Sequence, residues 1–256
     1  MLQVKLLEQF DVQRDGAPIS IPSRLAQSLF AYLLLTAGTA HRREKLAGLL
    51  WLDTTDENAR RNLRQELWRL RKAIESSAPG KGVTDFLLVD EITIAFDSQS
   101  DYWLDVSALA KSDVATASSQ DLIDALSLYR NELLPGFYDE WVVLERERLR
   151  AILEQKMARL LDLSIEEKRW HAVLEWGERW IALGQSPEPA YRALMAAHSA
   201  LGDRSKVAAV FERCAQALRN DLGVEPSSQT QGLFEQLSNN SFRTTDDSLP
   251  ARPPAM

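Results

Sequence analysis

Six cationic side chains lie within thirteen residues of this sequence. The stretch RRNLRQELWRLRK, residues 60–72, holds five arginines and one lysine against a single acidic residue, Glu66. Arginine can form two parallel hydrogen bonds with guanine, asparagine and glutamine can do the same with adenine, and lysine binds phosphate oxygens. These residue types, concentrated in one short segment, indicate binding to duplex DNA.

The same stretch has the periodicity of an amphipathic helix. One line along the helix, which we expect to pack on the core, carries Ala59, Leu63, Leu67, Leu70 and Ile74. The other face, its edges and the core boundary carry the candidate DNA contacts, which are Asn58, Arg61, Asn62, Arg64, Gln65, Trp68, Arg69, Arg71 and Lys72. The alternative interpretation is a solvated face with internal ion pairs such as Asp56–Arg60 and Glu57–Arg61.

The charge of the chain is unevenly distributed. The whole chain has 30 basic and 37 acidic side chains, but residues 1–100 hold 13 of each, so the net charge of −7 falls on residues 101–256. A local basic patch on a neutral domain is typical of nucleic-acid-binding proteins. The acidic remainder limits indiscriminate binding to polyanions.

Strands and a helix are predicted before the basic segment. Alternating apolar residues predict short strands up to about residue 20, with a hairpin turn at Asp15–Gly16. An apolar helix over 23–37 follows, with its start at Ser20 and Pro22 and its stop at Gly38.

Two more helices and a second hairpin complete the first half. Residues 42–51 form a short helix, and 57–76 form the basic helix with Asp56 as its cap. Strands at 86–89 and 92–96 flank a tight turn at Asp90–Glu91. This order predicts a winged helix-turn-helix domain (α+β) over residues 1–98, whose third helix enters the major groove.

The second half has the pattern of an all-α protein, so the fold class is mainly α. Three identities recur at a spacing of 34, the tetratricopeptide (TPR) period, at Val173/Val207, Glu178/Glu212 and Arg179/Arg213. We expect a TPR-like array over 101–240 and a disordered tail or linker over 241–256. The expected helices are 103–111, 120–131, 140–166, 170–183, 189–201, 204–219 and 228–238.

Three segments resemble the antibiotic regulatory protein (SARP) family. They are RREKLAGLLWLDTTDENARRNLRQELWRLRKAI (42–74), LYRNELLPGFYDEWVVLERERLR (128–150) and DLGVEPSSQTQGLFEQL (221–237). The resemblance covers about residues 1–240. It implies an OmpR-type winged helix followed by a TPR-like bacterial transcriptional activator domain, and hence a sequence-specific transcription regulator, an activator that recruits RNA polymerase or a second subunit.

By position, the resemblance also implies roles for single residues. The groove-reading residues of the family fall on Arg61, Gln65, Trp68 and Arg69, and its backbone contacts fall on Arg64, Arg71 and Lys72. Dimeric or tandem binding to direct repeats stays open, because a single winged helix reads one half-site.

The wing departs from the family pattern. Its tip, Asp90-Glu91, is acidic where related wings carry basic or small polar residues, although Lys81 at its base can reach a phosphate. The acidic tip favours the alternative function, a TPR-type protein–protein adaptor with a vestigial DNA-binding domain. In the second half, Trp170, Trp176 and Trp180 are candidates either for a partner-binding surface or for core packing between helices.

Other classes of function find no support in the sequence. The three histidines lack metal-ligand spacing, the one cysteine excludes an internal disulfide, and PGKG (79–82) lacks the pattern of a phosphate-binding loop. We therefore expect no catalytic residue, metal or cofactor. No signal peptide and no membrane-spanning run is apparent, so the expected location is the cytoplasm.

Overall fold

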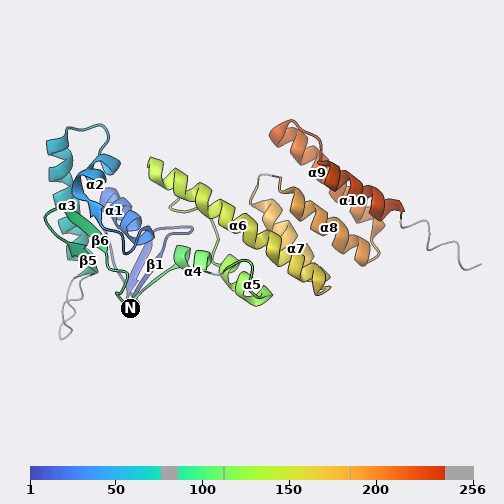
Figure 1. Cartoon of the computed structure of the whole chain (residues 1–256), viewed down its shortest axis with the longest axis horizontal. Coiled ribbons are helices and arrows are strands. Elements are labelled where there is room, and N and C mark those ends of the chain that lie inside the picture. Colours follow the sequence, from blue (N-terminus) through green and yellow to red (C-terminus); the bar gives the residue numbers. More distant parts are fainter. Residues whose placement is uncertain (76–85, 112, 185, 240–256) are drawn as a thin grey trace, which may run out of the picture. The chain divides into compact units, whose positions relative to one another are not determined.

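The computed structural model describes residues 1–75, 86–111, 113–184 and 186–239 (Figure 1). The chain forms two compact units. The first holds Met1–Thr116 and Ile123–Leu153, and the second holds Ala117–Leu122 and the chain from Glu154 onward. The first unit contains two small sheets and three helices ahead of residue 100, and the second is helical, so the predicted fold class is confirmed.

The first sheet has the strand order β3-β2-β1-β7. Strands β1 (Leu2–Lys5), β2 (Asp11–Arg14) and β3 (Ala17–Pro18) form an antiparallel meander. Asp15 and Gly16 connect β2 to β3 with φ of 51° and 82°. Two successive left-handed residues make the tight hairpin turn that the Asp-Gly pair predicted.

Strand β7 (Tyr102–Leu104) was not predicted from the sequence. It pairs in parallel with β1, in the register Val4↔Leu104, and helix α4 (Asp105–Lys111) begins directly after it. The expected helix at 103–111 was therefore wrong at its start. Three residues are too short for a readable alternation, and the pairing partner is about a hundred residues away.

The carboxylate of Asp105 joins the start of α4 to the end of β1. It accepts the backbone N–H groups of Leu6 at 2.9 and 3.0 Å, Leu7 at 2.9 Å and Val106 at 2.7 Å. Burial raises the pKa of this carboxyl, although the N–H groups and Lys5 oppose the shift. The contact fixes β7 and α4 to the first sheet.

Part of the second half of the sequence also belongs to the first unit. The backbone N–H of Leu134 donates to Leu6 O at 2.8 Å, and the rings of Trp141 and Tyr32 lie 5.4 Å apart between centroids. Arg146 holds this segment in place by donating to the carbonyls of Leu133 and Leu134 at 2.8 and 2.7 Å. The winged-helix core therefore continues well beyond residue 98 in the chain.

The second sheet is the wing. It has the order β4-β6-β5, from β4 (His41–Arg42), β6 (Thr93–Phe96) and β5 (Leu87–Val89), and it confirms the predicted hairpin. Helices α1 (Arg24–Leu35), α2 (Arg43–Leu50) and α3 (Asp56–Ile74) complete the winged helix. The caps differ from those expected: Ser23 caps α1, accepting from Ala26 N at 3.4 Å, and Thr55 precedes α3.

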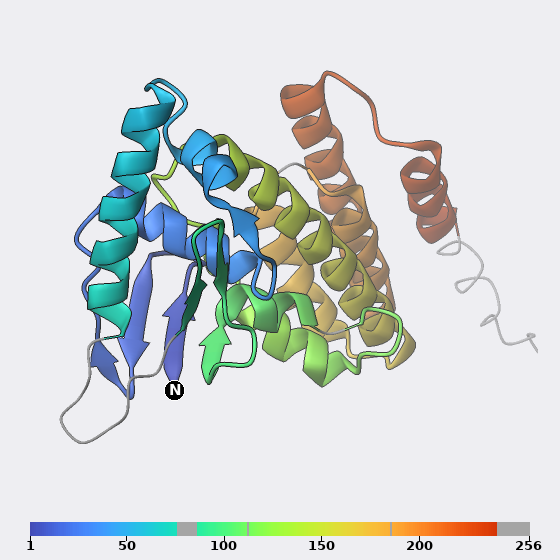
Figure 2. The same ribbon diagram turned by 60° about the vertical axis from the view of Figure 1, so that its left-hand side comes forward.

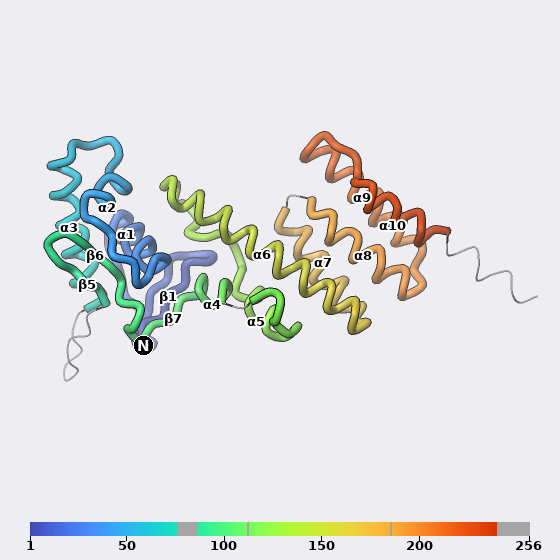
Figure 3. The backbone as a smooth tube through the Cα atoms, in the orientation of Figure 1, coloured from blue at the N-terminus to red at the C-terminus, as the bar shows by residue number. Residues whose placement is uncertain are grey.

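The second unit is a series of helices joined by short turns, drawn from yellow to red in Figure 3. Gly177 of α7 lets α7 and α8 approach closely, because a Cβ there would lie 2.8 Å from Leu194 Cδ2. The side chain of Arg213 on α9 donates to Glu178 Oε2 on α7 at 2.8 Å. The helices are α5 (Ser119–Ser127), α6 (Glu140–Glu166), α7 (Trp170–Ala182), α8 (Glu188–Ala200), α9 (Arg204–Leu222) and α10 (Ser228–Asn239), of which α5 and α6 contribute to both units.

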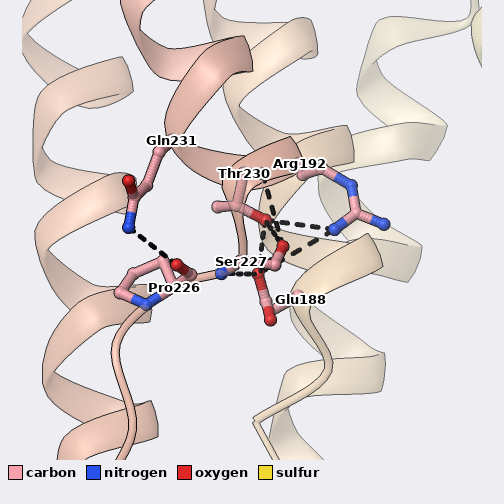
Figure 4. A network of polar contacts seen from close by, with 6 residues as sticks. All are labelled: Glu188, Arg192, Pro226, Ser227, Thr230 and Gln231. Atoms are coloured by element: carbon pink, nitrogen blue, oxygen red, sulfur yellow. Dashed lines mark hydrogen bonds and ion pairs between the residues drawn. The ribbon is translucent and has the colours of Figure 1, made fainter.

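A carboxylate at the start of α8 binds the start of α10 (Figure 4). Glu188 Oε2 accepts the N–H of Ser227 at 3.0 Å and the hydroxyls of Ser227 and Thr230 at 2.7 and 2.5 Å. Burial would raise the pKa of Glu188, but the hydrogen bonds from Thr230 and Ser227 outweigh it and hold the pKa below its usual value. Arg192 completes the network by donating to the Thr230 hydroxyl at 3.1 Å.

Candidate nucleic-acid interface

Helix α3 is nineteen residues long, about 28 Å at 1.5 Å per residue. Asp56 and Glu57 stand in its first turn, and Arg71 and Lys72 in its last turn. These charges complement the helix dipole at both ends and stabilise the helix. In Figure 2, α3 is the teal helix along one edge of the first unit.

The predicted apolar line of α3 is confirmed as its buried face. Every residue on that line is buried, from Ala59 at 4% exposure to Ile74 at 0%. The face packs on α1 and α2, the other helices of the motif. Because this face is held inside the unit, the opposite face is fixed in direction.

The outward face carries the predicted contact residues. Trp68 is 61% exposed, and Asn62, Arg69 and Arg71 are half-buried at the edges. Within the described part of the chain, the side chains of Arg61, Arg64 and Gln65 make no hydrogen bond or ion pair. Apart from Asp56 and Glu57, the remaining exposed residues of the helix are Asn58, Arg60, Arg61, Arg64, Gln65 and Lys72.

The ion pairs of the alternative interpretation do not form among the described residues. Neither Asp56–Arg60 nor Glu57–Arg61 is paired, and all four side chains are exposed. The arginines that the pairs would have used are thus available to an external anion. The two ion pairs that the alternative interpretation proposed are thus absent among these residues.

Two predicted contacts are instead held by carboxylates of the same helix region. Arg69 Nη1 donates to Glu66 Oε1 at 2.6 Å, and Arg71 Nε donates to Glu75 Oε2 at 2.7 Å. Both carboxylates have side chains only 9% exposed. Glu66 is the one acidic residue of the basic stretch, and no local pattern indicates that it is buried beside the apolar line.

Lys72 and Trp68 form a pair on the exposed side of α3. The ammonium of Lys72 lies 5.1 Å from the centre of the Trp68 ring, one turn away along the helix. A cation over an aromatic face at this distance is attracted by the ring. Lys72 is therefore positioned by Trp68 as well as by its own backbone.

One of the two acidic residues of the wing tip, Asp90, forms hydrogen bonds within the wing. Asp90 Oδ1 accepts the backbone N–H groups of Thr93 at 2.5 Å and Ile92 at 2.7 Å, and Oδ2 accepts the Thr93 hydroxyl at 2.8 Å. The hydrogen bonds from Thr93 and then Ile92 hold the pKa of Asp90 below its usual value. Arg43, at the start of α2, donates to Asp90 O at 2.8 and 3.0 Å. The predicted contact Lys81 lies outside the described residues.

Two of the three tryptophans of α7 are buried, in line with the core-packing alternative for this cluster. Trp176 and Trp180 are each only 5% exposed, and the guanidinium of Arg179 covers the Trp176 ring at 4.7 Å. Partner binding was therefore the wrong interpretation for these two residues, and core packing was the right one, because i,i+4 placement on an amphipathic helix puts both on its apolar side. Trp170 is half-buried, and its role stays a prediction.

The second unit contains a cavity that was not predicted from the sequence. It measures about 610 Å³ and is lined by α6, α8 and α10. Burial raises the pKa of Asp162 on its α6 side. No local sequence pattern indicates how far apart these helices lie, so the cavity could not be predicted. The other polar residues that line it are Arg192, Gln229 and Gln236.

The described residues hold no group of three or more potential metal ligands. Among them there is also no helix with the length and apolar character that crossing a membrane requires.

Comparisons with known proteins agree with this architecture. A family model described as bacterial transcriptional activator domain matches residues 103–238, just over half of the chain. A solved structure of Mycobacterium tuberculosis EmbR in complex with a low-affinity phosphopeptide matches with a TM-score of 0.79 at 19% identity, covering 93% of this chain and 65% of that one. The likeness shows the fold, and the chain spans less than two thirds of that protein. No curated protein sequence matches the chain.

Proposed function

Because the chain belongs to the bacterial transcriptional activator domain family, we propose that it is a sequence-specific DNA-binding transcription regulator and not an enzyme. In this proposal α3 enters the major groove, and the regulator acts as an activator in the bacterial cytoplasm. The helical unit recruits RNA polymerase or a second subunit. The resemblance to SARP-type regulators supports the same arrangement, with the winged helix ahead of the activator domain.

One observation carries the DNA-binding proposal. Arg61, Arg64 and Gln65 share the exposed side of a helix whose opposite side is buried, and within the described residues they have no internal partner. Their hydrogen-bonding groups match guanine and adenine edges and phosphate oxygens. No deformation of α3 is needed to present them to a duplex.

The first test is a gel shift of the full chain on its own upstream DNA, with a salt titration. If about 6 phosphates are neutralised, the log–log slope of the binding constant against salt is about −5. Selection of bound sites from random duplexes then gives the preferred sequence, and the spacing of half-sites reports dimeric or tandem binding.

Single substitutions separate base reading from phosphate binding. Arg61→Ala or Gln65→Ala relaxes discrimination at individual base pairs by about 1–3 kcal/mol each. Arg64→Ala weakens all sequences about equally, as loss of a phosphate contact does, and is the matched control on the same face. An Arg61→Ala protein with unchanged affinity and sequence preference contradicts the assignment of α3 as the reading helix.

The second candidate function is a protein–protein adaptor that has lost DNA binding. The acidic wing tip and the cavity of about 610 Å³ in the helical unit favour it. Adaptor function requires that the gel shift fail on every promoter fragment, or that any binding be independent of salt. Transcription in vitro at equal promoter occupancy then tests recruitment by the helical unit directly.

A further inference from the structure

Trp68 is an exposed aromatic residue on a face that is otherwise polar. Its side chain is 61% exposed, whereas its neighbours on the apolar line, Leu67 and Leu70, are 5% and 0% exposed. An indole left in water forgoes the stabilisation that burying its apolar surface would give. Its neighbours on the outward face are cationic and amide side chains, among them Arg64, Gln65 and Lys72.

The position of Trp68 on the helix matches that of the base-reading candidates. Gln65 lies three residues before it and Arg61 seven residues before it, so all three share one side of α3. Seven residues span about 10 Å along a helix, and base pairs are stacked about 3.4 Å apart. Because a helix in the groove is inclined to the duplex axis, Arg61 and Trp68 are therefore separated by at most about three base-pair steps.

The major groove offers one apolar group to such a side chain. Donors and acceptors line the base edges, but thymine also presents its C5-methyl group there, and apolar side chains recognise it by contact. The Lys72 ammonium, 5.1 Å from the ring centre, favours a fixed ring position and brings a positive charge beside it. The ring surface is thus suited to a methyl group in an anionic groove.

We propose that Trp68 is a specificity-determining residue that packs its indole against the C5-methyl group of a thymine, within about three base pairs of the guanine read by Arg61. The inference rests on the proposed function and adds to it the identity of one base. It also accounts for an exposed tryptophan that packing within the unit does not explain.

The test uses the full chain and the duplex selected from random DNA. Each thymine of that duplex is replaced in turn by deoxyuridine, which pairs identically but lacks the methyl group. Loss of one buried methyl contact weakens binding about three- to fivefold. We expect this loss at one thymine with the wild-type chain, no loss at that position with Trp68→Ala, and a retained loss with Trp68→Phe, which keeps an apolar ring. Leu52→Ala, at a side chain 73% exposed outside α3, is the matched control and keeps the wild-type profile.

The outcomes separate this inference from the proposal beneath it. Absence of sequence-preferring duplex binding contradicts the proposed function itself. Sequence-specific binding with a deoxyuridine profile that is flat, or that is the same for wild type and Trp68→Ala, overturns only the thymine contact. Should Trp68→Ala bind too weakly to measure, Trp68→Phe decides: a retained loss at the single thymine supports the contact, and a flat profile overturns it.

Discussion

Arg69 Nη1 donates a hydrogen bond to Glu66 Oε1 at 2.6 Å, one turn back along α3. The pair places a carboxylate within the helix proposed to meet a polyanion. Among the described residues, Glu66 Oε2 is buried without a hydrogen-bond partner. Glu66 therefore keeps one of the five arginines of the basic stretch in an internal ion pair, and burial of the Glu66 carboxylate has a cost in desolvation free energy.

Glu66→Gln is expected to tighten DNA binding. The change keeps the shape of the side chain, removes one negative charge from the helix and replaces the ion pair with Arg69 by a weaker, uncharged contact. We expect the free energy of DNA binding to become more favourable by about 1 kcal/mol or less at low salt, near the scale of one close charge pair in water. If Arg69 then binds a phosphate, the slope of the log binding constant against log salt concentration becomes steeper by about 0.9. Gel shifts at several salt concentrations measure both.

Glu57→Gln is the matched control for this prediction. It makes the same change in net charge on the same helix, but Glu57 is exposed and forms no ion pair among the described residues. An equal gain in DNA-binding affinity in both variants means that net charge alone affects binding and that the Glu66–Arg69 pair has no separate role.

Asp105→Ala is expected to loosen the first sheet. The substitution removes the acceptor of the backbone N–H groups of Leu6 and Leu7, and a buried donor left without a partner costs about 1–3 kcal/mol. Amide hydrogen exchange at Leu6 and Leu7 is then about ten- to a hundredfold faster. Asp101→Ala, at a side chain that is 77% exposed and pairs with the N-terminal amine, leaves both rates unchanged. Slow exchange in Asp105→Ala contradicts this role.

Gly177→Ala and Gly232→Ala are expected to change stability in opposite directions. At Gly177 the new Cβ lies 2.8 Å from Cδ2 and 3.1 Å from Cγ of Leu194, a fully buried side chain, and such overpacking costs about 1–3 kcal/mol. At Gly232, in α10, no atom lies within 4 Å, so alanine contributes its helix propensity, about 1 kcal/mol. Urea melts compare the two, and equal stabilisation would mean that Leu194 moves aside freely.

Cys214 is expected to resist thiol reagents in the folded chain. Its side chain is fully buried, and burial raises its pKa to about 11. At pH 8 the thiolate fraction is then about one in a thousand, and reaction is slow. Because this is the one cysteine of the chain, a colorimetric thiol assay reads a single site, with Cys214→Ser as the blank. Rapid native labelling contradicts the burial.

The same raised pKa fixes a direction for stability against pH. The protonated Cys214 thiol makes its full contribution to the free energy of unfolding below its ordinary pKa of 9.0, and this contribution is lost as pH rises through about 11. Stability measured against Cys214→Ser therefore falls for the wild type across that interval, in which the unfolded chain ionises first.

Regular local patterns were enough to predict much of the fold. The periodicity of α3 identified both its faces, and α6 was predicted over the residues that it occupies, 140–166. The Asp15–Gly16 turn could be predicted because few pairs of residues adopt two successive left-handed conformations. Each of these features depends on neighbouring residues only.

Features that depend on distant contacts could not be predicted. Strand β7 exists because β1 lies beside it, and Glu66 is buried because other elements of the unit cover it. The i,i+4 spacing of Trp176 and Trp180 left core packing and a partner surface both open, and the packed helices show that both side chains are buried. The repeat spacing gave a partial hint, since Glu178 and Arg213, from the two matched segments, form an ion pair.

The pairing of β1 with β7 has a consequence for how such proteins can evolve by exchange of parts. The family match begins at residue 103, inside β7, so the border recognised by sequence comparison cuts through a strand of the first unit. A recombination event at that border would separate Asp105 and Trp141 from their contacts in the first sheet and α1. Inheritance of the winged helix together with the chain up to Leu153 keeps the first unit intact, so we expect crossovers that spare this unit to fall within α6 rather than at the family border.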